Sequence, residues 1–176
     1  MALTTGYSKI CGARSGGIVN LWLVDKDDVN QTTGFTLAGG VYTAVTMVSG
    51  KVFYKFAFEQ DSAGMKWDAA VDGKTLSFSV AKTIEFFLGF LKQTQRTALQ
   101  SIADSSPCGM IAIAEDANAQ KWVLGYTEKQ KFGRPLRLKT SATDTGKVFT
   151  DANGTTVVMD ALDNELPLEF TGSVPV

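Results

Sequence analysis

The residue types that carry most enzyme chemistry are scarce in this chain. It contains no histidine and two cysteines, Cys11 and Cys108. Without imidazole there is no Ser-His-Asp or Cys-His nucleophile system, and two cysteines cannot complete a four-thiolate zinc site. An enzyme without histidine would need a pair of catalytic carboxylates, and the choice of Asp61 with Glu115 or Asp160 is arbitrary. The sequence therefore predicts a protein that is not an enzyme and that has no cofactor or metal.

Two short motifs resemble binding loops but fail on spacing. Gly73-Lys74-Thr75 ends like a phosphate-binding loop, yet the position that requires glycine, five residues before Gly73, is Asp68. The aspartates at 25, 27 and 28 lack the alternating ligands and the glycine of a calcium loop. We interpret the first motif as a hairpin turn and the second as part of a solvated loop.

One basic stretch, residues 129–139, contains Lys129, Lys131, Arg134, Arg137 and Lys139 with apolar residues between them. Such a pattern suits a nucleic-acid surface. It also suits an edge strand whose charges prevent aggregation. The formal net charge of the chain is only -1, so no global field attracts nucleic acid, and we favour the edge strand.

The cysteines also bear on the cellular compartment. They lie far apart, and the N-terminus has no apolar run of signal-peptide length. We therefore interpret both as buried thiols of a protein made in a reducing cytoplasm. No stretch reaches the roughly 20 apolar residues that would span a membrane, so no membrane partner is expected.

Side chains alternate between polar and apolar along residues 51–85, which is the pattern of strands with one wet and one buried face. The pattern predicts a four-strand antiparallel meander over 42–48, 51–60, 65–71 and 75–83. Ser49-Gly50 and Asp72-Gly73-Lys74 would form its hairpin turns. Further strands are expected at 18–24, 110–115, 120–126, 132–139, 156–162 and 165–171, the last two as a hairpin, with long polar loops at 25–40 and 140–155.

One helix is expected before Pro107, and two starting points fit. A long helix would begin near Phe86 and place Leu88, Leu91 and Leu99 on one face. Alternatively, 86–90 extends the preceding strand and the helix covers about 92–103, which Gly89 favours. In either case the fold class is mainly β, a sandwich or barrel of antiparallel strands with one α-helix. We expect a single domain over 1–176, with a flexible N-terminal arm at about 1–17.

Three aromatic residues exceed what these faces can bury. Phe53 falls on the charged side of its strand, and Phe86 and Phe90 are too many for one helix face. Apolar side chains on outward positions indicate a protein–protein interface.

The order of elements, a meander followed by a helix and a strand–turn–strand, resembles tail-tube-type structural proteins of tailed bacteriophages. Several stretches are similar to those of virion proteins from Bacteroidetes-infecting, crAss-like phages. These are Cys11 to Gly17 followed by IVNLWLVDKDDV, the stretch IAEDANAQKWVLGY, Thr145-Gly146 with Asp151, and the terminal LPLEFTG. The sequence departs from the pattern at 82–93, where KTIEFFLGFLKQ is longer than expected.

The resemblance implies a self-assembling protein of the virion tail, tail-tube-like in fold. Copies would form rings, usually hexameric, that stack with one another, meet other tail proteins and let genomic DNA pass without sequence-specific binding. The polar side of the meander would then line the channel, and its charged residues are Lys51, Lys55, Glu59, Lys66, Asp68 and Asp72.

The two long loops would make contacts between subunits, with Asp28, Thr145 and Asp151 among the contact residues. The alternative is a small monomeric β-sandwich binding module that recognises a ligand through loops 25–40 and 140–155.

Overall fold

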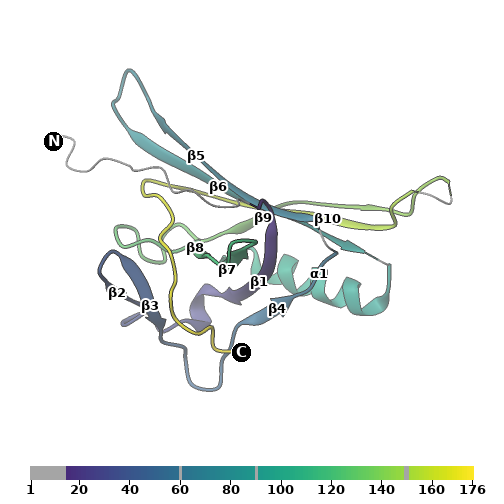
Figure 1. Cartoon of the computed structure of the whole chain (residues 1–176), viewed down its shortest axis with the longest axis horizontal. Helices are drawn as coiled ribbons and strands as arrows, with labels where there is room; N and C mark the ends of the chain where they lie inside the picture. The colour runs from purple at the N-terminus through teal and green to yellow at the C-terminus, as the bar shows by residue number, and fades with distance from the viewer. Residues whose placement is uncertain (1–14, 60, 90, 149–150) are drawn as a thin grey trace.

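The computed structural model describes residues 15–59, 61–89, 91–148 and 151–176, and its described part is mainly β, with antiparallel sheets and one α-helix (Figure 1). The elements are stacked in three layers. An outer sheet lies over a middle sheet, and a two-stranded ribbon lies on the far side of the middle sheet.

The middle sheet has the strand order β4-β1-β7-β8, with β1 at Ile18–Asp25, β4 at Tyr54–Phe56, β7 at Met110–Asp116 and β8 at Lys121–Leu124. The first five residues of β7, MIAIA, are all buried. Met110, Ala112 and Ala114 face the core under the outer sheet, whereas Ile111 and Ile113 face the ribbon side. A sheet covered on both faces requires such a continuous apolar run, and this explains the composition of β7.

The outer sheet has the order β5-β6-β10-β9, formed by β5 (Ala63–Val71), β6 (Phe78–Gly89), β9 (Arg137–Asp144) and β10 (Gly154–Asp163). Helix α1 (Gln93–Ser105) contributes Ile102 to the core between the two sheets. The rings of Trp67 on β5 and Trp122 on β8 lie 5.2 Å apart and also join these layers. The hairpin of β5 and β6 confirms the strand–turn–strand expected around Asp72-Gly73-Lys74.

The ribbon consists of β2 (Phe35–Ala38) and β3 (Val41–Val45), which follow the short 3₁₀ turn η1 (Lys26–Asp28). It packs Phe35 and Tyr42 onto the middle sheet beside Tyr126 and Phe170. The C-terminal segment runs from the outer sheet to a place between β8 and the ribbon, where the Phe170 amide donates to the Lys121 carbonyl of β8 and the Tyr42 amide of β3 donates to the Glu169 carbonyl, both at 2.8 Å.

Several expected strand pairings are wrong. Residues 42–48 do not pair with 51–60, because β3 turns back onto β2 through Gly39 and Gly40, whose φ angles are 62° and 85°. Such a Gly-Gly turn is a hairpin signal that the sequence reading overlooked. The four-strand meander is therefore split. Of its expected strands, only β5 and β6 belong to the outer sheet, whereas β4 pairs with β1 in the middle sheet.

The expected loops and the last hairpin also need correction. The loop 25–40 contains β2, and the loop 140–155 contains much of β9 and the start of β10. Residues 165–171 leave β10 and meet the middle sheet at Glu169 and Trp122 instead. Of the two helix starts, the later one is confirmed, because β6 continues to Gly89 and α1 begins at Gln93.

Two smaller expectations fall partly outside the described residues. Of the N-terminal arm, the described part is tied down where the Ser15 amide donates to Asn118 Oδ1 at 3.2 Å. The Cys108 thiol is exposed rather than buried, and Cys11 lies outside the described residues.

Candidate assembly surface

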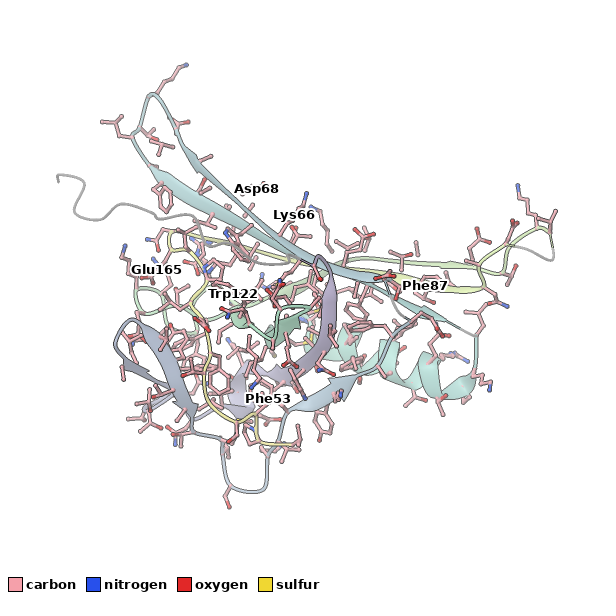
Figure 2. The ribbon with its side chains drawn as sticks, viewed as in Figure 1. Phe53, Lys66, Asp68, Phe87, Trp122 and Glu165 are labelled. Atoms are coloured by element: carbon pink, nitrogen blue, oxygen red, sulfur yellow. The ribbon has the colours of Figure 1, made fainter. Side chains whose placement is uncertain are left out.

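The outer sheet covers the core with one face and leaves its other face bare. Among the described residues, no element packs on the face that points away from the middle sheet (Figure 1). Figure 2 shows Lys66 and Asp68 along β5, on the side of the sheet away from Trp122. Strand register then assigns the charged residues of this bare face, which are Lys66, Asp68, Glu85, Arg137, Lys139, Asp144 and Asp160.

Hydroxyl groups lie between these charges. Lys66 pairs in register with Thr83, Thr83 with Asp160, and Asp160 with Arg137, so one rung of the face crosses all four strands. Asp160 also forms an ion pair with Lys139, with Oδ2 and Nζ 3.0 Å apart. The arrangement is a wet, polar face of nearly balanced charge.

In the described part of the chain no strand pairs with the outer edge of β5 or of β9, although the Leu138 amide near the start of β9 donates to Ser106 Oγ at 2.8 Å. β5 pairs only with β6, and β9 only with β10. Proteins usually protect long edge strands from pairing with other chains by cover, bulges or charge. Here β9 has one bulge, between its pairings with Val158 and Met159, and β5 has none.

The strands of the outer sheet are staggered. One rung joins Ala63, Phe86, Val157 and Ser141. Toward Val71, β5 extends farther from this rung than β9 does. In the opposite direction, β9 continues to Asp144, whereas β5 has already ended. Such a progressive displacement tilts the strands relative to the line from edge to edge, as in sheets that close into barrels.

The hairpin of β5 and β6 projects beyond the middle sheet as an arm, which we define as residues 68–78 (Figure 1). Every residue of the arm is exposed, and its apolar side chains are accordingly solvated: Val71 is 61% exposed, Leu76 78% and Phe78 42%. At its turn, Asp72 Oδ1 accepts the amides of Lys74 and Thr75, both at 2.8 Å. The Thr75 and Lys74 amides lower the pKa of the Asp72 carboxyl below its usual value.

The residues expected to line one channel face fall into two groups. Lys66 and Asp68 lie on the bare face, and Asp72 lies at the turn of the arm. Lys51 and Lys55 lie elsewhere, because the chain that carries them belongs to the middle sheet and the loop before it, and Glu59 lies in the connection from β4 to β5, beside Gly89 of β6. Lys51 pairs with Asp28 at 3.0 Å, and Lys55 Nζ lies 5.8 Å from the ring centre of Trp22. The prediction that all six share one face is therefore wrong.

Phe53 and Phe86 are not interface residues, which corrects a second expectation. Phe53 is 2% exposed and packs in the core beneath the ribbon, because the irregular chain before β4 breaks the alternation that placed it outward. Phe86 is fully buried because β6 extends through it, so that it faces Phe56 and Phe58 at ring distances of 6.1 and 6.4 Å. Phe90 lies outside the described residues.

The remaining contact residues stay predictions. Asp28 lies in η1, whereas Thr145 and Asp151 lie in the connection from β9 to β10, at the opposite end of the molecule from the ribbon (Figure 1). Asp151 Oδ2 accepts the amides of Lys147 and Val148, which lower the pKa of its carboxyl. Because the segments 25–40 and 140–155 are so far apart, they cannot form a single ligand site.

Several hollows mark the surface of the described residues. A groove of about 560 Å³ lies between β4 and α1 and is lined by Tyr54, Phe56, Phe58 and residues of the helix. Glu115 accepts a hydrogen bond from Asn20 at 2.6 Å and Asp160 binds Lys139, so each has a partner other than Asp61. Within the described residues there is no cluster suited to hold a metal ion, and no helix long and apolar enough to cross a membrane.

Comparisons of the chain with models of protein families, with curated proteins and with solved structures find no match. Sequence reasoning missed Glu85, Arg137, Lys139, Asp144 and Asp160 as members of the bare face. The strand predicted at 156–162 belongs to β10, whereas its partner β9 extends into the segment 140–155 that the sequence predicts as a loop.

Proposed function

We propose that this protein is a self-assembling virion structural protein of the tail-tube kind, in which the outer sheets of several copies close into one barrel. The observation that carries the proposal is the outer sheet itself, which is staggered, has two open edges and has a bare polar face. A contact between β9 of one copy and β5 of the next removes both open edges, which resolves the hazard that exposed edges present.

The strand directions suit a closed ring. Each strand of the outer sheet runs antiparallel to its neighbour, so β5 and β9 at the two edges run in opposite directions. Under rotational symmetry, β9 of one copy therefore meets β5 of the next in antiparallel orientation. A head-to-tail contact between two different surfaces produces a closed ring when the rotation between copies closes.

The bare face would line the channel of this ring. Its basic residues Lys66, Arg137 and Lys139 are nearly balanced by the acidic residues of the same face, which are Asp68, Glu85, Asp144 and Asp160. Phosphate-neutralising lysines and arginines hold DNA through counterion release, so a balanced surface lets DNA pass. Six copies would give a barrel roughly 50 Å across, from strands about 4.8 Å apart and tilted by about 40°.

The resemblance of the sequence to tail-tube-type phage proteins supports the same function and adds its biological setting. It implies hexameric rings that stack, contacts with other tail proteins, synthesis in the cytoplasm of a bacterial host and a final place in the virion tail.

Electron microscopy of the purified protein, with light scattering after size exclusion, tests the proposal. We expect rings or tubes whose abundance rises with protein concentration. A species that stays monomeric across the whole concentration range would overturn the proposal and leave the monomeric binding module as the better interpretation.

A further inference from the structure

We propose that neighbouring copies join in one particular register, with Lys66 of β5 opposite Asp144 of β9 and with Asp72 opposite Arg137. The inference rests on the proposed function, because it specifies the contact through which the rings would form. It identifies four exposed charged residues as the determinants of that contact.

The two faces of the sheet restrict the possible registers. Asp144 pairs with Gly154 and Arg137 with Asp160, so both residues share the bare face with Lys66. In a continuous sheet, a slip of one residue would exchange the two faces of the added strand. Asp144 must therefore lie opposite Gly64, Lys66, Asp68 or Ala70, because these residues of β5 share that face.

Charge selects among these registers. Asp68 opposite Asp144 would place two carboxylates together, which destabilises a strand pair, and Gly64 or Ala70 would leave Asp144 without an opposite charge. Lys66 opposite Asp144 instead forms an opposite-charge pair. Arg137 and Asp144 have no ion-pair partner among the described residues, and Lys66 has only Asp68, at 3.9 Å with both side chains exposed.

The same register satisfies the other end of β9. On its inner side β9 already pairs with β10. Gly154 pairs with Asp144 and Asp160 pairs with Arg137, and the bulge of β9 lies between these two pairs. Lys66 and Asp72 are separated by the same number of residues along the chain as Gly154 and Asp160. A second strand that follows β9 as β10 does therefore places Asp72 beside Arg137.

The surface at the start of β5 leaves room for the neighbour. A hollow of about 480 Å³ lies there, lined by Asp61, Ser62, Lys66 and Glu85 among others. In the proposed register the chain that follows Asp144 of the neighbour, residues 145–148, runs past Ser62 along this hollow.

Reversal of the charges on one edge at a time tests the register. The first variant combines Arg137→Glu with Asp144→Lys, and the second combines Lys66→Glu with Asp72→Lys. Each alone places like charges opposite each other, so we expect each to need about tenfold more protein to assemble than the unaltered chain. An equimolar mixture restores every opposite-charge pair and should assemble at the original concentration as rings of alternating copies. Circular dichroism confirms that the variants fold, since all four side chains are exposed.

The results separate this inference from the proposed function. If the unaltered chain forms rings but each variant also assembles normally, the register is wrong and the tube function stays in place. The same holds if the unaltered chain forms rings but the mixture of variants is not rescued. An unaltered chain that is monomeric at every concentration would overturn both.

A cysteine cross-link measures the register directly. In a Cys11→Ser and Cys108→Ser background, Ala70→Cys with Thr140→Cys places the two thiols opposite each other at the contact, within disulfide distance. We expect a ladder of covalent oligomers on oxidation. The matched pair Ala70→Cys with Ala142→Cys is displaced along β9 and should give none, and cross-linking of that pair alone would overturn the register.

Discussion

The ammonium group of Lys82 donates a hydrogen bond to the Asp163 carboxylate, with Nζ and Oδ2 3.1 Å apart and both side chains almost fully buried. Lys82 lies on the covered face of the outer sheet, where its neighbours in register are Trp67 on β5 and Ala161 on β10. Burial lowers the pKa of the Lys82 ammonium, and the charge of Asp163 opposes that shift. The ion pair thus joins β6 to the end of β10 where the arm leaves the body.

Loss of one partner of this pair should destabilise the fold. Asp163→Asn leaves the buried Lys82 without a counter-charge, so we expect the free energy of unfolding to fall by about 3–5 kcal/mol. The double variant Lys82→Met with Asp163→Leu removes both charges and should lie close to the unaltered protein. Urea denaturation measures both values, and a loss below about 1 kcal/mol for Asp163→Asn would contradict the prediction.

Tyr42 should make the fold sensitive to alkali. Its phenol is fully buried, and burial followed by the charge of Glu128 raises its pKa well above the usual value. Above pH of about 10 the unfolded chain loses this proton and the folded chain keeps it, so stability falls as pH rises. The fall attributable to Tyr42 should approach about 1.4 kcal/mol per pH unit.

The comparison with Tyr42→Phe isolates this effect, because the other alkaline groups are common to both proteins. The difference in unfolding free energy should be constant below pH of about 10 and should change in favour of Tyr42→Phe above it. Parallel curves for the two proteins throughout the alkaline range would show that Tyr42 ionises in the folded state.

Gly154 should not tolerate a side chain. A Cβ at this position would lie 2.4 Å from the Leu88 carbonyl oxygen and 2.4 Å from the Phe87 ring. We expect Gly154→Ala to lower stability by about 1–3 kcal/mol, because the strand must shift. Gly64→Ala is the matched control in the same sheet, since its Cβ would meet no heavy atom within 4 Å. Thermal melts compare the two, and equal losses would refute the steric argument.

The apolar residues of the arm should serve assembly rather than folding. Leu76 and Phe78 are largely exposed, so Leu76→Ser with Phe78→Ser should change monomer stability by no more than about 0.5 kcal/mol. The same variant should assemble less readily, because solvated apolar patches indicate interfaces. Val19→Ser, at a position 57% exposed on β1, is the control and should assemble normally in light scattering. Normal assembly of the arm variant would exclude the arm from the contact.

The local features of the fold followed from the sequence. Alternation along 65–83 with an Asp-Gly turn predicted the hairpin of β5 and β6, and it placed Lys66 and Asp68 on a wet face. Of the two helix starts that the sequence left open, the later one, which Gly89 favours, is the one that the structure has. These features depend on residues close in sequence, where turn chemistry and side-chain period are sufficient.

Tertiary structure decided which strands became partners, because a period of two defines the faces of a strand but not its neighbour. The middle sheet took β4 beside β1, which separated Lys51 and Lys55 from Lys66 and buried Phe53 under a second layer. Arg137 lies in a strand that was expected at 132–139 and Asp144 in a segment expected to be a loop, and both gained their place on the bare face only when β9 paired with β10. The pairings of β10 with β6 and of β4 with β1 join residues that are distant in sequence, so local patterns cannot specify them.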